Sequence, residues 1–197
     1  MADVSIVNVG YMSTNFWVVS AGRSRIIVDL GWPGTWGTMQ AGLERMDVPL
    51  TELRYGLATH YHMDHAGLAQ EFKAHGVPLL VLEEQVSAIP AMKQWMKPTD
   101  HYSEITAHDN TVIRLADSRA LLATMGLHGE IVHTPGHSDD SVSLLLDNGA
   151  VCTGDLTRPG LGETEQKAAQ VDASWALLRS KGATRVYPGH GPVYALG

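Results

Sequence analysis

The chain has 197 residues, of which 44% are hydrophobic and 18% charged, a composition typical of one folded domain. Its formal net charge of −7 argues against a nucleic-acid partner, because such surfaces use Lys and Arg to neutralise phosphates. No apolar run approaches the roughly 18–20 residues of a membrane span, and the N-terminus lacks the basic and apolar segments of a secretory signal. We therefore expect residues 1–197 to form a single cytoplasmic domain with no membrane partner.

Short apolar runs rich in β-branched residues alternate along the chain with stretches of helical periodicity. In chain order, we predict strands at 4–9, 15–20 and 25–29, a helix at 35–46, a strand at 55–58, a helix at 67–74, a strand at 78–82, a helix at 83–96, strands at 111–115, 130–133, 141–146 and 150–153, a helix at 166–181 and a strand at 185–187. Many of these strands are apolar on both faces, as strands covered on both sides are. The order predicts an α/β fold in which helices pack outside two sheets.

The run His60-Tyr61-His62-Met63-Asp64-His65 places four metal-capable side chains between an apolar strand and a helix. In an extended segment, side chains two residues apart point the same way, so His60 and His62 can converge on one ion. The chain then turns, which lets Asp64 and His65 face a neighbouring position. Imidazoles and carboxylates suit zinc, iron and manganese, so the run predicts a metal site.

Three further candidates, His137, Asp155 and His190, each lie in a short polar turn after an apolar run. Glycine directly precedes all three, which allows close backbone approach at the end of a strand. Each turn alone is typical of an ordinary loop. Together with the first run, in this order, they predict one composite metal centre.

These motifs resemble those of the metallo-β-lactamase superfamily, over nearly the whole chain from Asn15 and Asp29 to His190. The resemblance implies an αββα four-layer sandwich of two mixed β-sheets flanked by helices. It implies a first metal held by His60, His62 and His137, a second held by Asp64, His65 and His190, and Asp155 as the bridge between them. Asp29 matches an acidic residue that orients a ligand histidine in this family.

The family chemistry implies two divalent metal ions, zinc in first place with iron or manganese as alternatives. Two such ions lower the pKa of a bridging water, and the resulting hydroxide attacks a small-molecule substrate. Asp64 is the candidate catalytic residue, because a free carboxylate oxygen would accept or pass a proton.

The bridging position separates branches of the family. True β-lactamases of this fold carry Cys or Ser there, whereas Asp155 resembles the glyoxalase II, lactonase, ribonuclease Z and persulfide dioxygenase branches. The acidic charge argues against ribonuclease Z, and the chain ends too soon after His190 for the basic C-terminal domain of glyoxalase II. We therefore predict a single-domain dinuclear hydrolase of a small ester, lactone or thioester.

Three other functions stay open at this point. One is a mononuclear iron oxidoreductase resembling persulfide dioxygenase, which uses the positions of His60, His137 and Asp155 around one iron. Another is a promiscuous β-lactamase-like hydrolase, and the third is a metal-binding domain without catalysis. Retention of the full ligand set argues against the third, and oxygen dependence distinguishes the first.

Substrate recognition is expected from loops around the centre. The candidate residues are Trp32 and Trp36, which follow Asp29, and a set between the first and second motifs: Ile89, Met92, Trp95, Met96, His101 and Tyr102. Such side chains form an adaptable apolar pocket or the packed face of a helix, and both interpretations are kept.

Two residues near the motifs need a simpler interpretation. His133 is a candidate support for a ligand, since it lies four residues before His137. Cys152 is the only cysteine, so no internal disulfide forms, and we expect it to pack as a small buried residue rather than act as a catalytic thiol.

Overall fold

The computed structural model describes residues 4–160 and 165–197. Its strands are β1 (Val4–Asn8), β2 (Trp17–Ala21), β3 (Ser24–Val28), β4 (Leu53–Leu57), β5 (Leu80–Leu82), β6 (Thr111–Ile113), β7 (Gly129–His133), β8 (Val142–Leu146), β9 (Ala150–Gly154), β10 (Arg185–Pro188) and β11 (Tyr194–Ala195). Its α-helices are α1 (Trp36–Arg45), α2 (Met63–Ala66), α3 (Ala69–Ala74), α4 (Ala88–Ala91), α5 (Ser118–Thr124) and α6 (Glu165–Ser180). Short 3₁₀ turns occur at Leu50–Glu52, Glu83–Gln85, Met92–Trp95, Pro98–Asp100 and Leu115–Asp117.

The strands form two mixed sheets and one small pair. The first sheet has the order β1-β2-β3-β4, in which only β3 and β4 are parallel. The second has the order β11-β10-β9-β8-β7, in which only β9 and β10 are parallel. The parallel pair β5 and β6 continues beside β4 through a bridge between Gly56 and Leu79.

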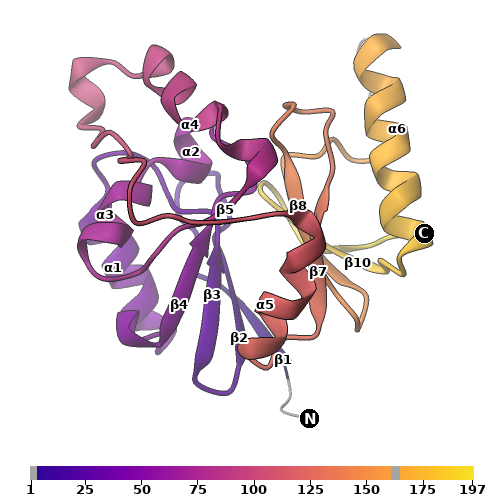
Figure 1. Ribbon diagram of the computed structural model, residues 1–197, viewed down its shortest axis with the longest axis horizontal. Coiled ribbons are helices and arrows are strands. Elements are labelled where there is room, and N and C mark those ends of the chain that lie inside the picture. Colours follow the sequence, from indigo (N-terminus) through magenta and orange to yellow (C-terminus); the bar gives the residue numbers. More distant parts are fainter. Residues whose placement is uncertain (1–3, 161–164) are drawn as a thin grey trace.

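Three apolar cores separate four layers of secondary structure. One core lies between the first sheet and α1, α2 and α3, and includes Ile27 and Phe72. The central core joins the two sheets, and the third packs α6 onto the outer face of the second sheet around Trp175. Figure 1 shows α1 and α3 on one side of the molecule and α6 on the opposite side. The predicted αββα sandwich is therefore confirmed.

Alternation along the strands explains why they are apolar throughout. In β3, Ile26 and Val28 point into the central core, whereas Ile27 points to the helices. In β8, Leu144 lies in the central core and Leu145 lies under α6. Since successive side chains of a strand point to opposite faces, a strand in the middle of a four-layer sandwich needs apolar residues at every position.

The predicted helix at 83–96 is wrong as a single element. That stretch is a 3₁₀ turn, the four-residue helix α4 and a second 3₁₀ turn. Pro90 has no amide hydrogen, so it cannot donate to the carbonyl of Val86, as a regular helix that begins at Glu83 would require; in the first turn of α4 no such bond is needed. The chain makes a turn at Val86 and Ser87 instead, and the second 3₁₀ turn ends at Trp95.

Three short elements, α2, α5 and β11, were not expected, whereas the long C-terminal helix was. Helix α5 has seven residues, too few for a clear helical period, and strand β11 has only two. The helix predicted at 166–181 is found at Glu165–Ser180. Within the described parts of the chain, no helix is both long and apolar enough to cross a membrane.

Candidate metal centre

The candidate ligands lie at one edge of the sandwich, where several strands end. Asp29 follows β3, the His60–His65 run follows β4, His137 follows β7, Asp155 follows β9 and His190 follows β10. β3 runs parallel to β4, and β9 runs parallel to β10. β7 and β9 are both antiparallel to β8 and so run in the same direction. In each sheet the carboxyl ends of these strands therefore lie at one edge, and the contacts of His65 with Asp155 and of His62 with His137 join the two edges.

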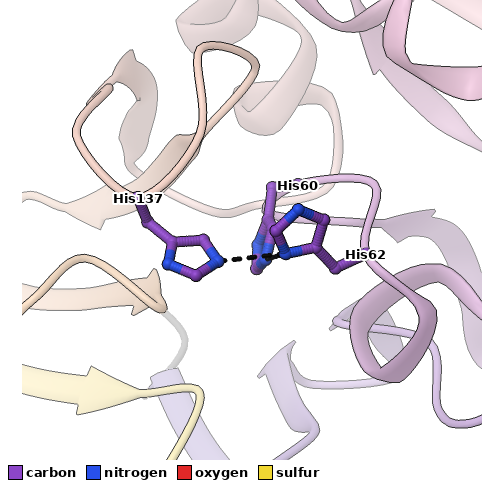
Figure 2. Close-up of side chains that lie close together, drawn as sticks. All are labelled: His60, His62 and His137. Atoms are coloured by element: carbon purple, nitrogen blue, oxygen red, sulfur yellow. Dashed lines mark hydrogen bonds between the residues drawn. The ribbon is translucent and has the colours of Figure 1, made fainter. Parts of the chain in front are cut away.

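Three histidines form the first group. Nε2 of His60 lies 3.1 Å from Nδ1 of His62, and Nε2 of His137 lies 3.0 Å from the same Nδ1. Figure 2 shows the three rings turned toward one another, with His60 and His62 on one loop and His137 on another. The three ring nitrogens are thus directed at a common point, as the ligands of a single cation are.

Hydrogen bonding selects the tautomer of His60. The hydroxyl of Thr59 has one hydrogen, which it donates to Oδ1 of Asp29 at 2.8 Å. The same hydroxyl oxygen lies 3.1 Å from Nδ1 of His60, so it accepts the Nδ1 hydrogen. Nε2 of His60 is therefore left with a free lone pair that faces the group. Burial, and then the neighbouring histidines, hold the pKa of His60 well below its usual value, which keeps the ring neutral.

Two histidines and two carboxylates form the second group. Nε2 of His65 lies 3.3 Å from Oδ2 of Asp64 and 3.1 Å from Oδ1 of Asp155. Nε2 of His190 lies 3.2 Å and 3.3 Å from the same two oxygens. On their far sides, Nδ1 of His65 lies 2.9 Å from Oδ2 of Asp29, and Nδ1 of His190 donates to the carbonyl of Ser13 at 2.6 Å. Both rings therefore present Nε2 to the group.

Asp155 lies between the two groups. Its Oδ1 is close to His65 and His190 of the second group, as given above, while its Oδ2 lies 3.8 Å from Nε2 of His137 in the first. The two oxygens of one carboxylate thus face different groups of side chains. A carboxylate in this position can contact two cations at once.

Two buried polar atoms of the second group have no hydrogen-bond partner. Among the described residues, Nε2 of His65 and Oδ1 of Asp155 are buried without a hydrogen bond, although 3.1 Å separates them. Burial lowers the pKa of His65, but the charge of Asp29 and the nearby carboxylates outweigh burial and hold it well above the usual value. Burial raises the pKa of Asp64, but His65 outweighs it and brings that pKa to about 2. Imidazole and carboxylate donors around such a point fit a divalent cation of the zinc, iron or manganese kind.

Glycines make room for this arrangement. A Cβ added to Gly189 would lie 2.5 Å from Oδ1 of Asp155 and 2.7 Å from Cε1 of His65. Gly154 has a positive φ of 53°, and a Cβ there would overlap the side chain of Thr59. The expectation that glycines before the ligands permit close approach agrees with both positions.

Several supporting residues escaped the sequence analysis. The Thr14 hydroxyl donates to Oδ2 of Asp64 at 3.2 Å, and Nε1 of Trp32 donates to the same hydroxyl at 3.1 Å. The buried amide of Gln85 donates to the carbonyls of Ala58 at 2.9 Å and Asp140 at 3.3 Å, which ties the loop after β4 to the loop before β8. These partners are far apart in sequence, so no motif or spacing indicates them.

The candidate pocket residues separate into different roles. Trp32 contacts Thr14, as described, and Trp36 packs edge-on against Phe72 and stacks on His75. Tyr102 is half-buried beside the helices of the first layer. Trp95 is 66% exposed and lines a cavity of about 350 Å³ with His62, Met63 and Asp64. Of these candidates, Trp95 lines the cavity at the ligands.

The two simpler interpretations have different outcomes. Nε2 of His133 lies 2.7 Å from the carbonyl of Asp139, so this ring contacts its own loop and is not seen to support a ligand. Cys152 is buried in the central core, as expected. Burial, together with the charge of Asp29, raises the pKa of its thiol, which keeps it protonated and unsuited to act as a nucleophile.

The four-layer sandwich, with its paired histidine and aspartate groups at one edge, defines a class of metal-binding αββα hydrolases. The chain belongs to the metallo-beta-lactamase superfamily, whose family model matches residues 9–190. Among its relatives, a probable metallo-hydrolase of Methanocaldococcus jannaschii is 23% identical over 93% of this chain and 90% of its own length. A lactamase-like protein of Pestalotiopsis microspora is 30% identical over 90% of this chain. This chain spans about half of that relative, which is covered to 49%.

Solved structures share the fold. A metallo-beta-lactamase family protein of Thermus thermophilus superposes with a TM-score of 0.72 and 20% identity, over 98% of this chain and 74% of its own. The protein TTHA1623, in a di-iron-bound form, superposes with a TM-score of 0.69 and 24% identity, over 98% of this chain and 94% of its own. At these identities the likeness establishes the fold alone.

Proposed function

We propose that the chain is a dinuclear metal-dependent hydrolase of a small ester, lactone or thioester. The observation that carries the proposal is the placement of Asp155, whose two oxygens face two separate groups of ligand-type side chains. His60, His62 and His137 would hold one cation and Asp64, His65 and His190 the other, with Asp155 shared. When bound, two divalent cations lower the pKa of a shared water and polarise the oxygen of the electrophile.

The protein itself supplies orientation and charge. Asp29 acts on a ligand in each group, through Thr59 on His60 and directly on His65. His65 brings the pKa of Asp64 to about 2, so Asp64 is ionised near neutral pH and suited to bind a cation or accept a hydrogen bond; it is a weak base there and cannot act as the acid. It also lines the cavity beside His62, where a substrate would reach it. The ionised carboxylate supports Asp64 as a ligand, and its place at the cavity keeps it as our candidate catalytic residue.

Two observations bear on the substrate and the metal. The aspartate at position 155, where β-lactamases of this fold carry Cys or Ser, favours ester, lactone or thioester substrates over β-lactams. The di-iron form of TTHA1623 supports two bound ions and makes iron an alternative to zinc. A neutral or weakly polar small molecule suits the acidic net charge of the chain better than a polyanion.

Metal content of the purified chain, measured by elemental analysis, tests the proposal. We expect about two equivalents of divalent metal in the wild-type chain and about one in each of His62→Ala and His65→Ala, because each variant loses a ligand of one group. Exposed His128 offers a matched control, and His128→Ala should keep both ions. A single equivalent in the wild-type chain, unchanged in His65→Ala, would contradict the dinuclear site.

Turnover on the same samples tests the chemistry. We expect hydrolysis of at least one ester, lactone or thioester, lowered on the order of 10²-fold or more in both ligand variants. Rates in air and under nitrogen should be equal. A reaction that requires oxygen would instead support the mononuclear iron oxidoreductase.

A further inference from the structure

The cavity beside the candidate metal centre has its own chemical character. We propose that this cavity, the Trp95 cavity, lined by His62, Met63, Asp64 and Trp95, binds an apolar acyl or alkyl group of the substrate. The inference rests on the proposed function and deepens it, because it names the part of the substrate next to the reacting bond. Trp95 is then a specificity-determining residue rather than a catalytic one.

The turn that carries Trp95 directs it away from the core. Met92, at the other end of the same 3₁₀ turn, is 1% exposed and packs in the core of the first layer. Met96 is partly buried against that core. Trp95, between them, is 66% exposed. The two methionines therefore hold the turn in place while the indole is left facing solvent at the cavity, with a large apolar surface uncovered.

The cavity opens onto both groups of candidate ligands. His62 belongs to the first group and Asp64 to the second, and both line the cavity. A molecule in it would lie against one candidate ligand of each group. Met63, between these two ligands in the chain, adds a flexible thioether to the wall. A group bound in this cavity therefore lies beside the candidate metal centre and not on a remote surface.

The lining selects an apolar group. Among the described residues, no Lys or Arg side chain lines this cavity, and its ionisable side chains are those of the two candidate ligands. Lys93, two residues before Trp95, is paired with Glu104 at 2.6 Å, so its charge is already compensated. An indole face and a thioether attract hydrocarbon chains and rings, and a volume of about 350 Å³ is at the small end of ligand pockets. We therefore assign a short to medium acyl chain or a single ring.

Affinity for straight-chain hydroxamates of two to eight carbons, measured on metal-loaded protein, tests this inference. The hydroxamate head chelates the cations, and each methylene that enters the cavity should tighten binding about fourfold. We expect this rise in the wild-type chain, a nearly flat series in Trp95→Ala and an intermediate series in Trp95→Phe. Because Trp95 is exposed, Trp95→Ala should keep the metal content and the far-ultraviolet circular dichroism of the wild-type chain.

Each outcome decides between the two proposals. Equal slopes in the wild-type chain and Trp95→Ala, or a flat series in both, would overturn the Trp95 cavity while leaving ester hydrolysis intact. A rising series in a chain that hydrolyses no ester, lactone or thioester would support the cavity and overturn the proposed reaction. Failure of every hydroxamate to bind the metal-loaded chain would overturn both.

Discussion

At the scale of single residues, the candidate ligands are held by polar contacts with residues outside the two groups. Asp29 acts on His60 and His65, Ser13 accepts from His190, and Thr14 donates to Asp64. Such partners hold the orientation and protonation of a ligand, and their removal typically weakens metal binding by about 10- to 100-fold. Thr14 is the sharpest case, because it is 2% exposed and its hydroxyl is itself oriented by Trp32.

Thr14→Val should weaken the second metal site selectively. Valine keeps the shape of threonine but cannot donate to Oδ2 of Asp64, which belongs to the second group. We expect roughly tenfold lower affinity for the second ion and unchanged affinity for the first, measured by titrating the metal-free chain with cobalt(II) and following its absorbance.

Thr14→Ser, which keeps the hydroxyl, is the matched control and should titrate like the wild-type chain. Identical titrations for Thr14→Val and Thr14→Ser would show that the hydroxyl does not position Asp64.

At the scale of elements, the turns that follow the strands determine how closely the ligands approach one another. The turn after β10 passes so near the second group that the backbone at Gly189 occupies the place of a side chain. Its amide donates to the carbonyl of Gly154 at 2.7 Å, and its carbonyl accepts from Asn15 at 2.7 Å. The turn is thus held from both sides, and it has little freedom to move away from an added methyl group.

Gly189→Ala should damage the second metal site. The added Cβ would lie 2.5 Å from Asp155 and 2.7 Å from His65, so both ligands must shift. We expect loss of the second equivalent of metal and a fall in the free energy of unfolding of about 1–3 kcal/mol, measured by elemental analysis and urea denaturation.

Gly37→Ala is the control for this change. Gly37 lies in α1, and a Cβ there meets nothing within 4 Å. That variant should keep both ions and should be as stable as the wild-type chain or more stable by up to about 1 kcal/mol, because alanine favours helix. Retention of both ions in Gly189→Ala would contradict the tight packing of the turn.

At the scale of the whole molecule, the candidate centre spans the interface between the two sheets. His60 to His65 follow a strand of the first sheet, whereas His137, Asp155 and His190 follow strands of the second. Below the centre, the sheets are joined by the central core, and beside it Gln85 connects a loop of each. Cations at the centre would therefore tie the sheets together at their upper edge, and removing them should loosen the sandwich as a whole.

Metal removal should lower thermal stability. An ion that binds only the folded chain stabilises it by about 4 kcal/mol when its free concentration is roughly 1,000 times Kd. For a chain of this length that corresponds to a fall in Tm of roughly 8–16 °C per site after treatment with a chelator. Calorimetry of the wild-type chain with and without chelator measures this shift.

The ligand variants provide the comparison. His62→Ala should show a smaller chelator shift than the wild-type chain, because one site is already weakened, whereas His128→Ala should show the full shift. A Tm that chelator leaves unchanged in the wild-type chain would argue that no ion links the two sheets.

Much of the fold and of the candidate centre followed from local features of the sequence. Strands such as β3 and β8 were predicted because their residues are apolar on both faces, which only a doubly covered strand requires. The seven candidate ligands were predicted because they follow strand ends in short turns, and their assignment as ligands stays a prediction that the metal measurements address. The single helix predicted at 83–96 was wrong, because a helix that begins at Glu83 needs the amide hydrogen that Pro90 lacks.

The sequence by itself determined the apolar strands and the helices, and hence the layers of the fold. It also determined which residue types stand at the ends of the strands, and hence the chemical character of the centre. Only the tertiary structure decided which distant groups support them: Thr14 with Asp64, Asp29 with His60 and His65, and Gln85 between two loops. It also decided that Trp95 faces the ligands while Met92 faces the core. The physical reason is that strand and helix patterns depend on neighbouring residues, whereas these contacts depend on which loops the packing of the two sheets brings to the same edge.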